Sequence, residues 1–424
     1  MGVRRYGGSW VIAGVMLVIV AYVLPVAVSL GGMSAYVVPA ALYTLAAPLL
    51  YVGARGFGGV RREAVLPLLP VLIVMRIVTD VIAGAYQGFG VNLLSVSSLN
   101  VVINLIRLAP LIVSLELLRV TLVARSIHSS RVGLRILGVF AMMTVLYTSP
   151  ALLTTLVSIG NAGSAIALLT SNVFPTAMYN IVLTVLALSG GATAAIPYAY
   201  VVKAYVYATP YLPVLKGLLR PVLYAAVTIL QLSIIATVTG KSSVREELRS
   251  RLSMLRRRMK FRRVFNGVSI GVGLVAFAII FTLIISGARL FVVVSGSMIP
   301  TLNIGDVAVV TPTKTVNVGT IAVYAGPSAP VIHRVIRVIN EPNGSRLYVF
   351  KGDNNAAPDP GLVKESQIIG RYAFKIPYAG LPVLYLSRIT GGYKAAVKVV
   401  LTLALFLYAL VLFKEVISID KFRQ

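Results

Sequence analysis

The feature that most constrains the fold is a series of apolar stretches of roughly 20 residues each, the length that a helix needs to cross a bilayer. In hydrocarbon the backbone polar groups must be satisfied within the segment, and a helix achieves this. The stretches lie near 10–30, 34–54, 64–86, 100–124, 136–158, 165–189, 193–213, 221–239, 267–288 and 395–413. They predict a polytopic α-helical membrane protein. The first stretch lacks a clear cleavage site of small residues, so we expect an uncleaved span rather than a signal peptide.

Charged residues are scarce, at 12% of the chain, against about 25% in soluble domains. This excludes a soluble enzyme for most of the chain. The 39 Lys and Arg residues outnumber the 12 Asp and Glu residues, which gives a net charge of +27. Basic residues stand between the apolar stretches, where they set orientation, so we expect the lipid bilayer and no nucleic acid as their partner. With no Cys and two His, no metal site or other cofactor is expected.

The basic residues occupy alternate loops and thereby predict an orientation. They precede the first stretch and follow the second, fourth and eighth, with the strongest run between 241 and 263. The N-terminus and a basic amphipathic segment at 241–265 are therefore expected in the cytoplasm. Lys216 and Arg220 fall on the predicted outer side, so the number of spans between 190 and 240 stays open.

The same orientation divides the rest of the chain. About eight spans are expected in residues 1–240, and a further transmembrane anchor at 266–288 would carry residues 289–392 out of the cytoplasm. A C-terminal helix with a short tail, 393–424, would return the chain. The predicted localisation is the cell membrane, multi-pass, with residues 289–392 extracytoplasmic.

Residues 289–392 differ in composition from the remainder. Short β-branched runs alternate with Gly, Pro, Asn and Asp, a pattern typical of strands and turns. The expected strands are Phe291–Val294, Val307–Val310, Val331–Ile339, Arg346–Phe350 and Gln367–Phe374. The sequence predicts a small all-β domain, which at about 100 residues can bury its own core.

Three clusters in this domain have residue types that support hydrolytic chemistry. The run Ser295–Leu302 places Ser between Gly and Pro, which favours a fixed turn that exposes a hydroxyl and backbone N–H groups. His333 lies on an expected strand, and imidazole is a base of near-neutral pKa. Asp353 and Asp359 follow in a turn-forming region, and a buried carboxylate can hold an imidazole in the correct tautomer. Taken singly, each cluster is equally consistent with an ordinary turn or surface residue.

Together these clusters form an ordered set of motifs. The chain has Ser295–Thr301, Gly305-Asp306, Ile332–Ile336, Lys351–Asn355 and Pro377–Gly380, with Asp359 between the last two. In this order they resemble the motifs of type I signal peptidases of the archaeal and endoplasmic-reticulum branch. The resemblance covers roughly 266–414 and departs from the family at Ile304, where Arg is usual, and at Pro358, where Asp or Asn is frequent.

The resemblance implies roles for individual residues. Ser297 would be the nucleophile and His333 the general base, where the bacterial branch carries Lys. Asp359 would be the charge-relay acid with Asp353 beside it, and which of the two contacts His333 stays open. The Ser295 hydroxyl and the Ser297 amide would form the oxyanion hole. Supporting motif positions are Met298, Pro300, Gly305, Asp306, Arg334, Gly352 and Asn354.

The implied activity is that of a membrane-bound serine endopeptidase that cleaves N-terminal signal peptides from secreted and membrane pre-proteins. Its expected partners are those pre-proteins, the bilayer and the protein-translocation machinery. The alternative is a polytopic transporter or a secretion-machinery scaffold with an accessory peptidase-like domain. Residues 1–240 carry no motif that we assign to a family.

Charged residues inside the expected spans bear on the role of residues 1–240. Arg76 and Asp80 stand four residues apart on one helical face, and Arg107, Glu116 and Arg119 follow. Because charges in hydrocarbon are costly unless paired, we expect ion pairs between helices. A polar path or a groove for a partner is the functional alternative.

Overall fold

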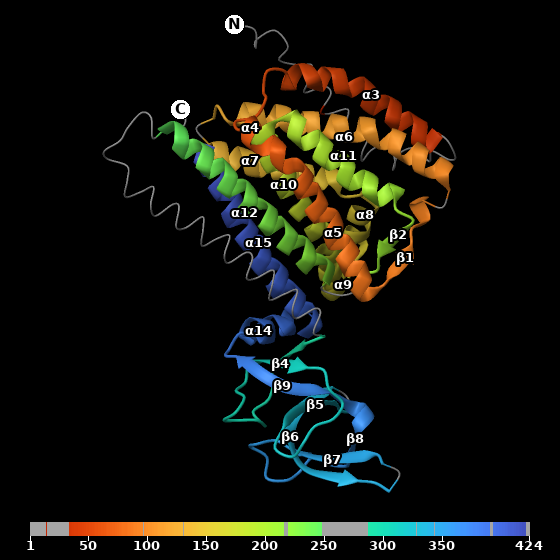
Figure 1. Ribbon diagram of the computed structural model, residues 1–424, viewed down its shortest axis with the longest axis vertical. Coiled ribbons are helices and arrows are strands. Elements are labelled where there is room, and N and C mark those ends of the chain that lie inside the picture. Colours follow the sequence, from red (N-terminus) through yellow and green to blue (C-terminus); the bar gives the residue numbers. More distant parts are fainter. Residues whose placement is uncertain are drawn as a thin grey trace. The chain divides into compact units, whose positions relative to one another are not determined.

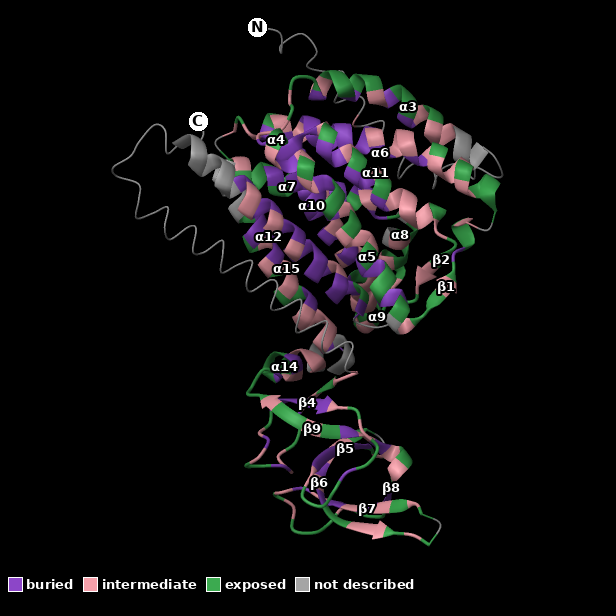
Figure 2. Ribbon diagram, in the orientation of Figure 1, coloured by how far each residue is buried: buried purple, intermediate pink, exposed green. Residues whose placement is uncertain are grey.

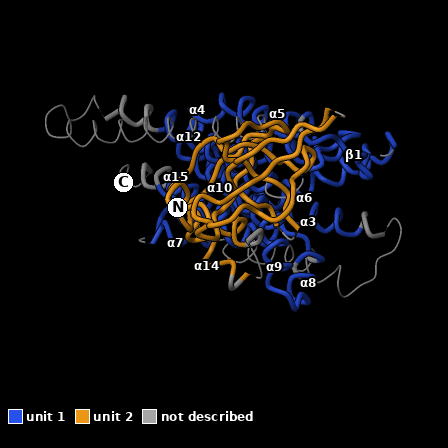
Figure 3. Tube along the Cα trace, turned by 90° about the horizontal axis from the view of Figure 1, so that it is seen from below, with its two compact units in different colours: residues 1–275, 401–424 blue, residues 276–400 orange. Residues whose placement is uncertain are grey.

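The structure is a computed structural model (Figure 1). It describes residue 14 and residues 34–95, 97–129, 131–215, 219–247, 287–327, 329–342, 344–390 and 393–420. The spans expected near 10–30 and 267–288 fall almost wholly outside the described residues, as does most of the basic segment 241–265. The chain forms two compact units, Met1–Val275 with Leu401–Gln424, and Ala276–Val400 (Figure 3).

The first unit is helical. Its elements are α3 (Ser34–Ala54), α4 (Arg62–Val65), η2 (Leu66–Leu68), α5 (Leu69–Gln87), β1 (Phe89–Val91), η3 (Leu93–Ser95), α6 (Ser98–Ser126), α7 (Val132–Tyr147), α8 (Pro150–Ser158), α9 (Ala162–Leu168), η4 (Leu169–Val173), α10 (Phe174–Gly190), α11 (Ala192–Ala208), β2 (Tyr211–Pro213), α12 (Leu219–Glu247) and the part of α15 (Tyr393–Asp420) from Leu401. Helix α10 packs against α6, α7, α11 and α12 and is buried along most of its length (Figure 2).

Within the described residues, five helical segments are long and apolar enough to cross a membrane. They are Arg62–Ala85, Ser98–Ser126, Ala162–Gly190, Leu219–Thr239 and Ala396–Lys414. Two shorter apolar helices, Val38–Ala54 and Val132–Tyr147, coincide with further expected stretches. The apolar stretches thus predict the helices of the described region well, apart from two breaks.

The first break corrects the span expected at 136–158. Helix α7 ends at Tyr147, and α8 begins at Pro150 with Ser149 as its N-cap; the Ser149 hydroxyl accepts a hydrogen bond of 3.2 Å from the Leu152 amide. The residue before a proline disfavours helical backbone, while proline suits the first helical position, so two helices form where hydropathy indicated one.

The second break lies in the stretch 193–213. Helix α11 ends at Ala208. The next residues form β2, which pairs antiparallel with β1 in the register Phe89↔Pro213. The span expected there is therefore shorter than the hydropathy pattern indicates.

The buried charges of α6 pair within the helix rather than between helices, contrary to expectation. Arg119 is fully buried and donates from Nε and Nη2 to the Glu116 carboxylate at 2.9 and 3.0 Å. Both side chains also form hydrogen bonds with neighbouring helices. Arg119 donates to Thr184 and Asn180, and the Tyr147 hydroxyl donates to Glu116 at 2.6 Å. The pair is neutral overall and fully hydrogen-bonded, the condition under which buried charges are tolerated.

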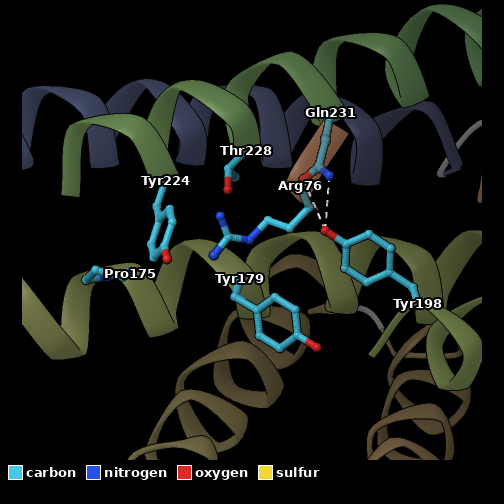
Figure 4. A pocket seen from close by; sticks show the side chains of 7 residues that line it. All are labelled: Arg76, Pro175, Tyr179, Tyr198, Tyr224, Thr228 and Gln231. Atoms are coloured by element: carbon cyan, nitrogen blue, oxygen red, sulfur yellow. Dashed lines mark hydrogen bonds between the residues drawn. The ribbon is translucent and has the colours of Figure 1, made fainter. Parts of the chain in front are cut away.

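A second charged pair, Arg76 and Asp80, also lies within one helix, α5, with 3.6 Å between Arg76 Nη1 and Asp80 Oδ1. Figure 4 shows the Arg76 guanidinium beside the ring of Tyr224, whose centroid lies 3.6 Å from Arg76 Cζ. Gln231 donates to the Tyr198 hydroxyl at 3.0 Å across the same pocket. This second pair likewise corrects the expectation of ion pairs between helices.

The second unit is built on an antiparallel sheet that, in the described residues, has seven strands in the order β3-β4-β9-β5-β6-β7-β8. The strands are β3 (Arg289–Val292), β4 (Val307–Thr311), β5 (Ile321–Ala325), β6 (Pro330–Asn340), β7 (Arg346–Lys351), β8 (Val363–Lys364) and β9 (Ile368–Ile376), with η5 (Glu365–Gln367) and α14 (Leu381–Thr390). The expectation of a purely β domain is therefore wrong, because the unit also contains the helix α14. Strands β5 and β8 were not expected from the sequence.

The core of this unit is formed by side chains of three adjacent strands. Ala322, Tyr324, Val335, Tyr348 and Phe350 form one buried cluster from β5, β6 and β7. Burial alternates along β6, with His333 and Val335 buried on the same face, as the sequence pattern predicts.

Candidate active site

Ser297 lies in a turn whose neighbours anchor it to the core. The turn follows β3, and its side chains Met298 and Leu302 are fully buried with Val293 and Ile321. The Leu302 amide donates to the Met298 carbonyl at 2.9 Å, and the Ile299 amide to the Gly296 carbonyl at 3.2 Å. Pro300 stands within this turn. Because the apolar side chains point inward, the turn holds the serine in one position.

The Gly352–Asn355 turn braces the serine from a second side. The Asn354 amide donates to the Ser297 carbonyl at 2.8 Å, and Asn354 Nδ2 donates to the Gly296 carbonyl at 3.2 Å. Gly352 packs directly against the Ser297 carbonyl, where a Cβ has no room. The predicted motif positions Gly352 and Asn354 thus contact the predicted nucleophile.

Gly305 and Asp306 form a third support. Gly305 has a φ of +90°, which favours glycine, and a Cβ there would meet the Leu381 side chain. Asp306 is fully buried, accepts hydrogen bonds from the Asn303 and Tyr378 amides and pairs with Lys375 Nζ at 2.9 Å. Burial acts to raise the pKa of Asp306, but the hydrogen bonds from Lys375 and the two amides outweigh it and lower that pKa. The carboxylate therefore joins the end of the serine turn to β9 and to the residues that follow β9.

His333 connects the serine to a carboxylate. Its Nε2 lies 2.9 Å from Ser297 Oγ, and its Nδ1 lies 2.6 Å from Asp359 Oδ2. His333 is 8% exposed and lies on β6, which pairs with β5 on one side and β7 on the other. With Nδ1 protonated and donating to Asp359, Nε2 is left to accept the Ser297 proton, which is the geometry for activating a hydroxyl.

Asp359, rather than Asp353, makes the contact with His333 that the sequence left open. The Asp359 amide donates to the Phe350 carbonyl at 2.8 Å, which fixes the carboxylate below the imidazole. Its Oδ2 also accepts a hydrogen bond of 2.8 Å from the Tyr324 hydroxyl. Pro358 precedes Asp359 without preventing this placement.

Asp353 contacts Arg334 instead. Arg334 donates from Nε and Nη2 to the two Asp353 oxygens at 2.8 Å each, and the Thr301 hydroxyl donates to Oδ2 at 2.5 Å. The hydrogen bonds from Arg334 are the main reason that the pKa of Asp353 is lowered. This pair joins β6 to the serine turn through Thr301, so Asp353 and Arg334 support the site without touching His333.

Ser295 is close to Ser297, with 3.3 Å between the two Oγ atoms. Its role in an oxyanion hole remains a prediction. Across the described ranges, no group of three His, Cys, Asp or Glu residues has the geometry to hold a metal ion. The chemistry that the described side chains support is proton transfer from a serine hydroxyl to an imidazole.

Sequence reasoning missed Tyr324 because it missed strand β5. The run Ile321–Ala325 is short and apolar and is followed by Gly326-Pro327, a pattern that could have indicated a buried strand ending at a turn. Lys375 was also missed; it donates to the Thr301 carbonyl at 3.0 Å as well as pairing with Asp306.

Comparison with known proteins finds relatives for about a quarter of the chain. No family model matches the chain. The chain is 34% identical over 113 residues to the signal peptidase complex catalytic subunit SEC11C of Homo sapiens and of Canis lupus familiaris, covering 24% of this chain and 59% of each relative. It is 34% identical over 114 residues to the signal peptidase complex catalytic subunit SEC11 of Eremothecium gossypii, covering 24% of this chain and 68% of the relative. The matched part thus falls short of two thirds of the SEC11C relatives.

Proposed function

We propose that this chain, which belongs to the family of the SEC11 signal peptidase complex catalytic subunits, is a membrane-bound serine endopeptidase that removes N-terminal signal peptides from pre-proteins. The observation that carries the proposal is the hydrogen-bonded series from Ser297 Oγ through His333 to Asp359 Oδ2, at 2.9 and 2.6 Å. A serine hydroxyl is a weak nucleophile until a neighbouring base takes its proton, and this series supplies that base.

The proposed reaction has two halves. Ser297 Oγ attacks the scissile carbonyl while its proton passes to His333 Nε2, and the amide bond breaks as the same proton passes to the leaving amine. Water then attacks the acyl-enzyme and gives a proton to His333, and that proton passes to Ser297 Oγ as the ester bond breaks and the carboxyl product leaves. Asp359 stabilises the imidazolium that forms in each half. The Ser295 hydroxyl and the Ser297 amide are proposed to donate to the oxyanion.

We propose that the helical unit makes the protein multi-pass and that the β-rich unit lies outside the cytoplasm. The support is the apolar helices and the basic run between 241 and 263. A protease added to sealed right-side-out vesicles should then cut within residues 289–392. Protection of this region until the vesicles are lysed would place it in the cytoplasm.

The alternative, a transporter or secretion scaffold, needs an inert β-rich domain. A catalytically idle domain has no physical reason to keep the three part-buried hydrogen bonds among Ser297, His333, Asp359 and Tyr324. We therefore prefer the peptidase. Association with the protein-translocation machinery is a separate proposal.

The test is cleavage of a model pre-protein by the full-length protein in detergent or liposomes. Ser297→Ala should lower the rate by several powers of ten while leaving expression and thermal stability unchanged. Ser366→Ala, at an exposed serine of η5 in the same unit, is the matched control and should cleave normally. Cleavage by Ser297→Ala at more than a few per cent of the wild-type rate would overturn the proposal.

A further inference from the structure

Tyr324 shares a carboxylate oxygen with the imidazole of the proposed site. Asp359 Oδ2 accepts hydrogen bonds from the Tyr324 hydroxyl at 2.8 Å and from His333 Nδ1 at 2.6 Å. Tyr324 lies on β5, beside β6 that carries His333, with Tyr324 paired to Val331 and Ala322 to His333. The phenol and the imidazole therefore approach the same oxygen from adjacent strands.

The tyrosine is itself held rigidly. It is 8% exposed, and its ring packs against that of Phe350 with 4.6 Å between centroids. Phe350 also accepts the Asp359 amide through its carbonyl. The same residue of β7 thus fixes both the ring of Tyr324 and the backbone of Asp359, so the distance between the phenol and the carboxylate is set by the core.

We propose that Tyr324 is a positioning residue of this site: its hydroxyl orients the Asp359 carboxylate so that Oδ2 accepts the hydrogen bond from His333 Nδ1 and Nε2 faces Ser297. This inference rests on the proposed function. A carboxylate can rotate about χ2 between broad minima, and a second donor on Oδ2 removes that freedom. Because the Tyr324 hydroxyl and His333 Nδ1 donate to the same oxygen, the two hydrogen bonds on Oδ2 depend on each other.

Tyr324 can act as this donor over the working pH range. Burial first, and then the hydrogen bond to the Asp359 carboxylate, raise the pKa of Tyr324. The phenol therefore keeps its proton where a peptidase of this type would operate. The donation runs from Tyr324 to Asp359 and is not reversed by ordinary changes of pH.

The test is Tyr324→Phe in the full-length protein, which removes the hydroxyl and keeps the ring that packs on Phe350. We expect kcat to fall about 10- to 100-fold, the change that corresponds to one hydrogen bond to a charged group. KM should stay unchanged, since Tyr324 acts through Asp359 and not on the substrate. Because Tyr324 and His333 share Oδ2, removing one donor alters how strongly Asp359 stabilises the imidazolium, so the acid limb of the pH–rate profile should be displaced.

Tyr348→Phe is the matched control. Tyr348 lies in the same core cluster and is fully buried, and its hydroxyl makes no hydrogen bond to any part of the chain that the structure describes. The substitution removes the same atom from the same core, and both kcat and the acid limb should match wild type.

The unfolding temperatures of both variants show whether a change in kcat comes from disturbed core packing or from lost positioning of Asp359. A lower kcat with a displaced acid limb in Tyr324→Phe, and neither change in Tyr348→Phe, supports the inference. An unchanged kcat in Tyr324→Phe, or a lower kcat with the acid limb in place, overturns it. Either result leaves the proposed function standing, because that function is tested separately by cleavage with Ser297→Ala.

Discussion

Gly352 lies so close to Ser297 that a Cβ at position 352 would stand 2.6 Å from the Ser297 carbonyl oxygen. The absence of a side chain lets the Gly352–Asn355 turn close on the serine turn and lets the Asn354 amide donate to that carbonyl at 2.8 Å. The nucleophile's backbone is therefore positioned by a segment more than fifty residues away in sequence, which joins two motifs of the resemblance into one structure.

Gly352→Ala should separate the two turns. The serine would move by a fraction of an ångström to an ångström, which can cost about 100-fold in rate when reacting groups lose alignment. We expect kcat for pre-protein cleavage to fall by about that factor while the protein still folds. Gly133→Ala, which places a Cβ in open space on α7, should have wild-type activity. Equal rates for Gly352→Ala and wild type would mean that this contact does not position Ser297.

The Asp353–Arg334 pair should make stability depend on pH in a defined direction. The pKa of Asp353 is lower in the folded protein than its unfolded pKa of about 3.9. The pair therefore stabilises the folded protein at pH values above the unfolded pKa and loses this effect as the pH falls through the folded pKa. Wild type should unfold at a higher temperature than Asp353→Asn at pH of about 6, and the difference should shrink as the pH falls below about 4 and vanish below the lower, folded pKa of Asp353. The measurement is the unfolding temperature of full-length protein in detergent. A difference that stays constant with pH would exclude this ion pair as its source.

Lysine should not replace His333. At this position an ammonium group would face the Asp359 carboxylate that lies 2.6 Å from His333 Nδ1, and an adjacent negative charge keeps an amine protonated. We expect His333→Lys and His333→Ala to lose about 1,000-fold or more in rate. Wild-type activity should fall on acidification, because a protonated imidazole cannot accept the Ser297 proton. Near wild-type cleavage by His333→Lys would show that the base is not specifically an imidazole.

The buried Glu116–Arg119 pair should govern the stability of the helical unit. Removing one partner leaves an uncompensated charge at a fully buried position, which costs about 3–5 kcal/mol in measured cases. Glu116→Gln should lower the thermal stability sharply, and adding Arg119→Gln should recover part of the loss. Arg135→Gln, at an exposed position of α7, serves as the control. If Glu116→Gln unfolds like the control, the pair has no structural role.

The sequence predicts which helices and strands form better than it predicts which residues contact one another. Hydropathy identifies α6, α10 and α12 because a span must be continuously apolar, but it does not detect the break at Ser149, which depends on the backbone restriction before Pro150. Strand alternation, which is also a local property, predicts that His333 and Val335 share one face of β6, and the structure shows that both are buried.

The choice between Asp353 and Asp359 could not be made from sequence, because it depends on how the segment after β7 folds back. The Asp359 amide bonds to Phe350 and brings that carboxylate to His333, whereas Asp353 is drawn to Arg334 on the opposite face of β6. Tyr324 was missed for a related reason. Its hydroxyl matters only through the pairing of β5 with β6, which is a long-range contact.

The most direct test of the central claim is to locate the acylated residue. Full-length protein would be treated with a serine-reactive acylating inhibitor and the adduct mapped by mass spectrometry of its fragments, with pre-protein cleavage measured in parallel. We predict an adduct on Ser297 that forms as cleavage is lost, and no adduct in Ser297→Ala or His333→Ala. Loss of cleavage with the adduct on another residue, or acylation of Ser297 that leaves cleavage intact, would contradict the assignment of Ser297 as the nucleophile.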